Sequence, residues 1–394
     1  MVSGVTCILV AALTTARPMS FREALERAAG HSPELAAARL AIPAAEAGAE
    51  AAGALPNPTL GASLGPDEPA VFGTVEQRLP VFGQRSSAVS AAAAEIPVAR
   101  AAVSQRELQL RAEVRRAYYA LAAAQEQVTV AGDTARLFGE LAEMAARKFE
   151  AGSSPQLDVE QAALAQRRAS QDVEDRRAAL QIARLHLATI LGEAPESDIG
   201  AADPLLPLPG TRPLVDLLRG VEQHPEVGSA EREREAALAR ADRERAAVRP
   251  TPAVSLEVER LSDPSRVGLR GGLTFEVPML SQNGGAVRGH QVQAEAAAAR
   301  RLAARHRLEG AAREAWTRWE AAARRARFGG DELIPSARRV AQLARVGYDV
   351  GRTPLANVVL AEAAVATARS KAIDAAGEAW AALADLEEAA GANP

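Results

Sequence analysis

The chain has 394 residues, only 3% of them aromatic, and its formal net charge at pH 7 is −4. Acidic and basic side chains are interspersed, so the sequence lacks the strongly basic surface that nucleic-acid binding requires. Alanine is abundant, large core-filling side chains are scarce, and Cys7 is the sole cysteine, which excludes an intrachain disulfide and a cysteine-rich metal site. This composition favours long, thin helical packing over a thick globular core.

Residues 1–20 are predicted to be an export segment, because the run from Val5 to Ala16 has the length of a signal peptide's apolar region. Basic residues are missing ahead of that run, so a truncated start and an apolar tail stay open as alternatives. No stretch of the sequence reaches the roughly 18 consecutive apolar residues of a membrane-spanning helix.

The rest of the chain is predicted to be two copies of one module, at residues 21–200 and 213–391, joined by a linker at 201–212. The segment Phe149–Val159 returns as Tyr348–Val358. A repeat of about 200 residues is too long for a solenoid unit and indicates that several elements were duplicated together. We therefore expect two pseudo-symmetric halves in one structure.

Each copy holds a predicted strand pair, at about residues 58–80 and 252–278. Apolar positions such as Leu60, Leu256 and Leu273 alternate with polar ones, which gives each strand one apolar and one polar face. Strands of roughly 8 to 11 residues with this pattern are typical of membrane barrels. Because four strands cannot close such a barrel, several chains would have to share one, and three copies would give twelve strands. The alternative is two β-hairpins packed on the helices of a soluble protein.

A long coiled-coil helix is predicted to follow the strands in each copy. In the first copy, apolar rows at seven-residue spacing from Val103 onward indicate one helix of roughly 65 residues that begins after Gly83. In the second copy, Pro335 is expected to bend the outgoing helix or shift its register. Glycine followed by proline indicates tight tips joining antiparallel helices at residues 152–155 and 351–354. An ordinary helical bundle is the alternative, although two hairpins this long need a larger assembly to bury their outer stripes.

This duplicated order of elements resembles the TolC-type outer membrane efflux protein family over nearly the whole chain. The most specific part is the pair of tip motifs, in which Gly152 precedes Asp158 and Gly351 precedes Asn357 at the same spacing. The segment Leu79–Arg85, after the second strand, looks most like the heavy-metal branch of the family. The resemblance implies a mainly α fold with a small β part: a homotrimer whose duplicated coiled-coil hairpins form a periplasmic α-barrel and whose strands, four per chain, form a twelve-stranded transmembrane β-barrel.

The resemblance also implies roles for individual residues. The tip residues would contact a periplasmic adaptor protein: Gly152, Ser153, Ser154, Pro155, Gly351, Arg352, Thr353 and Pro354. The periplasmic aperture would be lined by Asp158, Asn357 and Leu360, and the barrel lumen by Arg78, Glu257, Glu259, Arg270 and Glu276. At the aperture only Asp158 is acidic, so three copies would supply one ring of three carboxylates. An equally weighted alternative is that Asp158 has no aperture role and only stabilises the first turn of its helix, where the helix dipole favours a carboxylate.

The predicted function is that of a passive outer membrane channel in a Gram-negative bacterium. It would conduct metal ions, drugs or other small molecules from an inner-membrane pump to the exterior. The expected partners are two sister chains, an adaptor protein, the pump and outer membrane lipid, with no nucleic acid. The five histidines are scattered and no nucleotide or zinc motif occurs, so no catalysis, cofactor or metal site is expected. The alternative is a soluble or periplasmic coiled-coil structural or adaptor protein.

Overall fold

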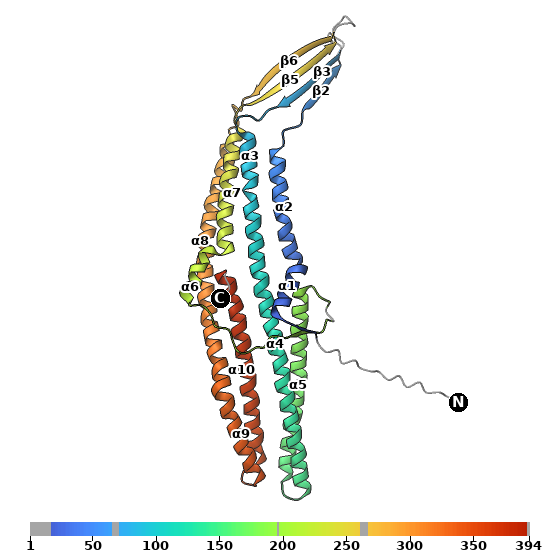
Figure 1. Ribbon diagram of the computed structural model, residues 1–394, viewed down its shortest axis with the longest axis vertical. Helices are drawn as coiled ribbons and strands as arrows, with labels where there is room; N and C mark the ends of the chain where they lie inside the picture. Colours follow the sequence, from blue (N-terminus) through green and yellow to red (C-terminus); the bar gives the residue numbers. More distant parts are fainter. Residues whose placement is uncertain (1–16, 65–70, 195–196, 261–266, 392–394) are drawn as a thin grey trace, which may run out of the picture. The chain divides into compact units, whose positions relative to one another are not determined.

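The computed structural model describes residues 17–64, 71–194, 197–260 and 267–391, most of which are helical (Figure 1). Residues 1–16 of the predicted export segment lie outside the described residues. Within the described residues, no helix is both long enough and apolar enough to span a bilayer.

The chain divides into two compact units. The first contains the residues up to Ser32, Leu108–Leu218 and the residues from Glu309 onward. The second contains Pro33–Glu107 and Arg219–Leu308. Each unit therefore draws residues from both predicted copies, while the boundaries of the copies themselves stay predictions.

The second unit consists of helices and one four-stranded sheet, which is described with the candidate site below. Helix α3 packs on α2 and on α7. The helices of this unit are α2 (Pro33–Gly53), α3 (Gln84–Ala93), η1 (Val221–Gln223), α7 (Pro225–Ala247) and the first parts of α4 (Glu95–Glu150) and α8 (Gly284–Phe328).

The prediction of one outgoing helix of roughly 65 residues after Gly83 was wrong at its start. The chain forms α3 and then the 56-residue α4, with a break at Ala94. The cause is Pro97, which has no N–H to donate to the carbonyl of Ala93 and whose ring collides with that carbonyl in a regular helix. The seven-residue apolar rows begin only at Val103, after this proline, so the periodicity did not show the break.

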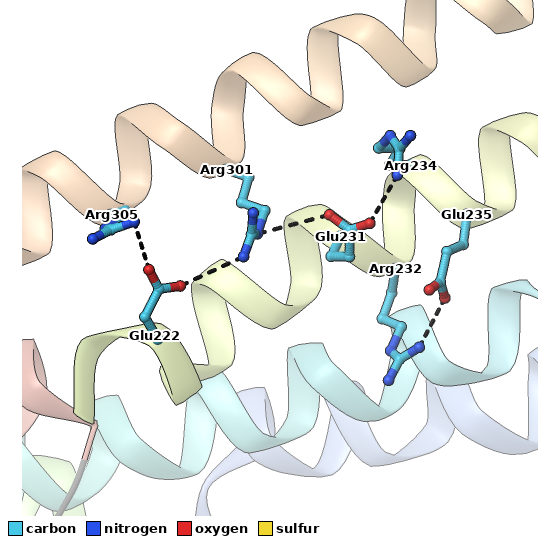
Figure 2. A network of polar contacts seen from close by, with 7 residues as sticks. All are labelled: Glu222, Glu231, Arg232, Arg234, Glu235, Arg301 and Arg305. Atoms are coloured by element: carbon cyan, nitrogen blue, oxygen red, sulfur yellow. Dashed lines mark hydrogen bonds and ion pairs between the residues drawn. The ribbon is translucent and has the colours of Figure 1, made fainter. Parts of the chain in front are cut away.

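Ion pairs join η1, α7 and α8 within the second unit (Figure 2). Glu222 accepts from Arg305 at 2.6 Å and from Arg301 at 3.5 Å, and Arg301 lies 3.7 Å from Glu231, which also pairs with Arg234 at 3.0 Å. These side chains are 35 to 45% exposed, so each pair contributes little and is screened by salt. A neighbouring apolar cluster stabilises the unit more than these ion pairs do, because salt does not screen it. The cluster consists of Val221, Val227, Ala304 and Leu308.

The first unit holds the two long hairpins. Its return helices, α5 (Gln156–Leu191) and α10 (Leu355–Ala390), are each 36 residues long and confirm the predicted return helices. Its other helices are α1 (Phe21–His31), α9 (Ile334–Asp349) and the later parts of α4 and α8, and α6 (Leu214–Gly220) lies at its boundary. Strands β1 (Arg17–Met19) and β4 (Ile199–Ala201) pair in parallel as a separate two-stranded sheet.

Tyr118 anchors β1 and the segment after β4 to α4. Its hydroxyl donates to the carbonyl of Met19 at 2.8 Å and accepts from the backbone N–H groups of Ala202 and Asp203 at 3.1 and 2.9 Å. Burial raises the pKa of Tyr118 to about 12, so the hydroxyl stays protonated and able to donate. The neighbouring Tyr119 stacks on Trp380 of α10 with ring centroids 3.5 Å apart.

A buried ionic cluster links α4 to α10 close to these aromatic rings. Glu387 is only 1% exposed and pairs with Arg111 at 2.5 Å and with Arg115 at 2.6 Å. Burial raises the pKa of this carboxyl, and the two guanidinium groups oppose that shift. The pairing offsets part of the cost of burying the charges of Glu387 and Arg115, and it joins the two hairpins at a specific contact.

Pro335 shifts the register of the second outgoing helix, as predicted. Helix α8 ends at Phe328, and a π-helical turn, η2 (Gly329–Leu333), precedes α9. In this turn Ile334 donates to the carbonyl of Gly329, five residues back, so one extra residue is accommodated ahead of the proline.

The two glycines of the π-helical turn are expected to respond differently to substitution. A Cβ at Gly329 would lie 2.9 Å from the Cβ and 3.4 Å from the Cα of Ala372, whereas a Cβ at Gly330 would meet nothing within 4 Å. Gly329→Ala should therefore destabilise the fold by about 1–3 kcal/mol, and the matched control Gly330→Ala should change it by less than about 1 kcal/mol. Denaturation midpoints of the two purified variants in detergent measure this difference. Equal midpoints would contradict the close packing of the turn on α10.

Candidate functional site

Four antiparallel strands form one sheet in the second unit, in the order β2-β3-β5-β6 (Figure 1). They are β2 (Thr59–Leu64), β3 (Val71–Arg78), β5 (Thr251–Arg260) and β6 (Val267–Glu276), which confirms the two predicted strand pairs. Residues 65–70 of the first predicted strand pair lie outside the described residues. The central pairing of β3 with β5 joins strands from the two predicted copies. In the described part of the chain, β2 and β6 each have one edge that bonds to no other strand.

One face of the sheet is apolar and uncovered. The register places Leu60 opposite Val75 and Val75 opposite Leu256, with Val254 opposite Leu273 on the same face. These side chains are between 42 and 75% exposed. A contiguous apolar surface of this kind, next to two unpaired strand edges, is typical of a surface that another molecule or a membrane covers.

The opposite face of the sheet is polar and carries the five residues predicted to line a lumen. The alternation of the strands brings Arg78, Glu257, Glu259, Arg270 and Glu276 onto this one face. Arg78 pairs with Glu276 at 3.2 Å, and Arg270 lies 3.7 Å from Glu257 and 3.6 Å from Glu259. The structure therefore brings the set together, and its exposure to a lumen stays a prediction.

The two helical tips have the same backbone geometry. Gly152 and Gly351 have φ angles of +69° and +71°, the left-handed conformation that favours glycine. At the first tip, Gly152 donates to the carbonyl of Phe149 at 2.8 Å and Ser153 donates to that of Lys148 at 2.8 Å. At the second, Gly351 donates to Tyr348 at 3.1 Å and Arg352 donates to Gly347 at 2.8 Å. Both tips are thus Schellman motifs. Pro155 and Pro354 then begin the return helices.

Most of the predicted tip residues meet around one groove. It has a volume of about 560 Å³ and is lined by Lys148, Ser153, Ser154, Pro155, Asp158, Tyr348, Asp349, Gly351, Arg352, Thr353 and Pro354. Beneath it, the hairpins pack through a shared core that includes Leu141, Tyr348 and Leu355. The two tips therefore form one continuous surface from both copies.

Asp158 lies in this groove, whereas Asn357 and Leu360 lie on the exposed surface of α10. The Asp158 carboxylate accepts from the Ser154 hydroxyl at 2.7 Å and is half-buried. Leu360 is 70% exposed, and Asn357 is exposed as well. The structure does not bring the three predicted aperture residues together within one chain, so their meeting at an aperture stays a prediction that depends on sister chains.

The contact between Lys148 and Tyr348 was not predicted from the sequence. The Lys148 ammonium lies 3.9 Å from the centre of the Tyr348 ring, in the position of a cation–π contact between the two hairpins. Burial raises the pKa of Tyr348, the Ser154 side chain opposes this shift, and the charge of Asp158 adds to it. Tyr348 is 6% exposed, but its counterpart in the first tip, Phe149, is 44% exposed. The rarity of lysine was one signal that pointed to this position, because Lys148 is one of only two lysines in the chain.

No metal-binding cluster is formed by the described residues: nowhere do three His, Cys, Asp or Glu side chains gather in the way a metal ion requires. The sheet presents an uncovered apolar face, and the two tips share one groove.

The chain is similar over most of its length to one protein family and to several known proteins. A family model described as outer membrane efflux protein matches residues 24–193 and 220–392. The cobalt-zinc-cadmium resistance protein CzcC of Cupriavidus metallidurans is 25% identical over 393 residues, which cover 99% of this chain and 94% of that protein. The crystal structure of the outer membrane protein VceC from Vibrio cholerae has a TM-score of 0.76 at 18% identity, over 95% of this chain and 97% of that one. The Campylobacter jejuni CmeC outer membrane channel has a TM-score of 0.78 at 14% identity, over 95% and 86%.

Proposed function

Since the chain belongs to the outer membrane efflux protein family, we propose that it is the passive outer membrane channel of a tripartite efflux system. It resides in the outer membrane and extends into the periplasm, as the family does. The family match favours this role over that of a soluble or adaptor coiled-coil protein. The proposed role is conduction, and it requires no catalytic step in this chain.

The observation that carries the proposal is the four-stranded sheet. One face is apolar and exposed, the other is polar, and β2 and β6 each present an unpaired edge. Backbone groups cannot stay unpaired in lipid, so the edges need partners in a membrane. We propose that β6 of one chain pairs with β2 of the next and that three chains close a barrel of twelve strands. The apolar face would then meet lipid and the polar face would surround a lumen.

The helical tips are proposed to dock the periplasmic adaptor protein, which connects the channel to an inner-membrane pump. Two observations support this docking role: both tips have Schellman turns, at Gly152 and Gly351, and both line the same groove. Asp158, Asn357 and Leu360 are proposed to line the aperture of the trimer. Residues 21–200 and 213–391 are proposed to be the duplicated modules, with 201–212 as their linker.

The substrates are proposed to be metal ions, because the curated relative CzcC is a cobalt-zinc-cadmium resistance protein. Two of the three proposed aperture residues, Asn357 and Leu360, are not acidic. The tips are therefore not proposed to bind cations tightly. Drugs and other small molecules are the alternative cargo.

Cell fractionation combined with an export assay tests the proposed function. In the native bacterium, the chain is expected in the outer membrane fraction as a detergent-dependent trimer, and its deletion should raise the intracellular content of the exported metal. Re-expression of the chain should restore export only when the adaptor and pump are present. Recovery of the chain in the soluble periplasmic fraction, or export that is unaffected by deletion, would contradict the proposal.

A further inference from the structure

We infer that the polar face of the strand sheet makes the channel selective for cations, because glutamates on that face outnumber arginines two to one. The inference rests on the proposed function, which turns this face toward the lumen. The residues that set the sign of the selectivity lie in the sheet and not at the helical tips.

The charges on the polar face form two groups, each with one guanidinium between two carboxylates. In the Arg78 group, Arg78 lies 3.2 Å from Glu276 and 3.9 Å from Glu76. In the Arg270 group, Arg270 lies 3.7 Å from Glu257 and 3.6 Å from Glu259. One guanidinium can neutralise one carboxylate, so each group keeps one negative charge.

The other described positions on this face add no charge. The register assigns to it only uncharged residues beside the two groups: Thr59, Gly61, Ser63, Phe72, Thr74, Thr251, Ala253, Ser255, Gly268, Gly272 and Thr274. The described strands of one chain therefore carry an excess of two negative charges on this face. In the proposed trimer, the excess is repeated around the lumen by each sister chain.

The Glu259 carboxylate lies close to the sheet because the opposite residue, Gly268, has no side chain. A Cβ at Gly268 would lie 2.6 Å from Cγ of Glu259, so the Glu259 side chain lies across a position that only glycine leaves free. The side chains of Glu259 and Glu257 are 19 and 27% exposed, whereas that of Arg270 is 65% exposed. Arg270 therefore covers both carboxylates, and its removal would uncover two negative charges.

A charged lumen wall acts on ions more strongly than the same charges on an open surface. Low-dielectric walls focus the field into the water-filled space and raise the local concentration of counter-ions. The net negative wall would therefore enrich small cations, such as metal ions or protonated amines, and deplete anions of the same size. Because screening by salt weakens this effect, the selectivity should fall as ionic strength rises.

Reversal potentials in planar bilayers test the inference with the full-length trimer. Under a gradient of KCl, the wild-type channel is expected to pass K⁺ in preference to Cl⁻. The double variant Glu257→Gln with Glu259→Gln should lower the ratio of K⁺ to Cl⁻ permeability at least about twofold, and Arg270→Gln should raise it by a similar factor. Arg78→Gln, in the other group, should also raise it. The matched control Thr274→Val lies on the same face, changes no charge and should leave the ratio unchanged.

Particle mass in detergent confirms for each variant that the trimer has formed before its currents are compared. Opposite shifts in the glutamate and arginine variants would support the inference. An anion-selective wild type would overturn it, and so would selectivity that none of the charge variants alters; both results would leave the proposed channel function standing. The absence of any conductance would instead remove the proposed function, and the inference with it.

Discussion

Replacing Leu256 or Leu273 by arginine is expected to prevent assembly of the trimer, whereas arginine at the adjacent Thr274 should be tolerated. Leu256 and Leu273 lie on the exposed apolar face of the sheet, and Thr274 lies on the polar face. An arginine that faces lipid at the middle of the bilayer costs about 2–4 kcal/mol, and less near the interfaces. Each trimer would bear this cost three times, while an arginine at Thr274 would point into water.

The measurement for this prediction is the amount of trimer in the outer membrane fraction, compared among the three variants and the wild type. Leu256 is in the middle of β5, so Leu256→Arg should have the largest effect. Leu273→Arg and Thr274→Arg differ only in the face that carries the new charge, which makes them a matched pair. Wild-type amounts of trimer for Leu256→Arg would show that this face does not meet lipid.

The second prediction concerns the two tip glycines. Gly152→Val together with Gly351→Val is expected to abolish export while trimers persist. Both glycines have positive φ angles, and a β-branched residue there costs at least about 1–2 kcal/mol. A Cβ at either position would meet nothing within 4 Å, so the expected effect comes from the backbone and not from crowding. The Schellman turns would have to rearrange, and with them the surface that we propose for the adaptor.

Asparagine at the same two positions is the control, because asparagine tolerates the left-handed conformation better than other non-glycine residues. The double asparagine variant should retain most export, measured as metal tolerance of cells that lack the wild-type gene. Trimer amounts should be equal in the two variants. Full export by the valine variant would mean that tip geometry does not matter for docking, and loss of trimer would mean that the glycines act through folding.

The elements of this fold could largely be predicted from local patterns. Alternation around Leu60 and Leu256 predicted the strands, and glycine followed by proline predicted the tips. Pro335 was recognised as an interruption, but Pro97 was not, because it falls within the first turn of a strongly periodic helix. A proline tolerated at the start of a helix leaves little trace in apolar periodicity.

The contacts between the copies could not be predicted, because they depend on tertiary packing. Nothing in the local sequence states that β3 pairs with β5, that the Lys148 ammonium covers the Tyr348 ring, or that Glu387 is enclosed by two arginines. The polar face of the sheet is an intermediate case. Alternation predicted which residues share it, and only the register showed that each arginine lies between two glutamates.

The mass of the purified particle tests the central claim most directly: the strands of one chain are incomplete and form a closed wall only with those of sister chains. Protein extracted from the outer membrane in mild detergent should contain three chains per particle, each of 41.2 kDa before any processing. It should also lose solubility when the detergent is removed. A particle with one chain that stays soluble in plain buffer would contradict the account.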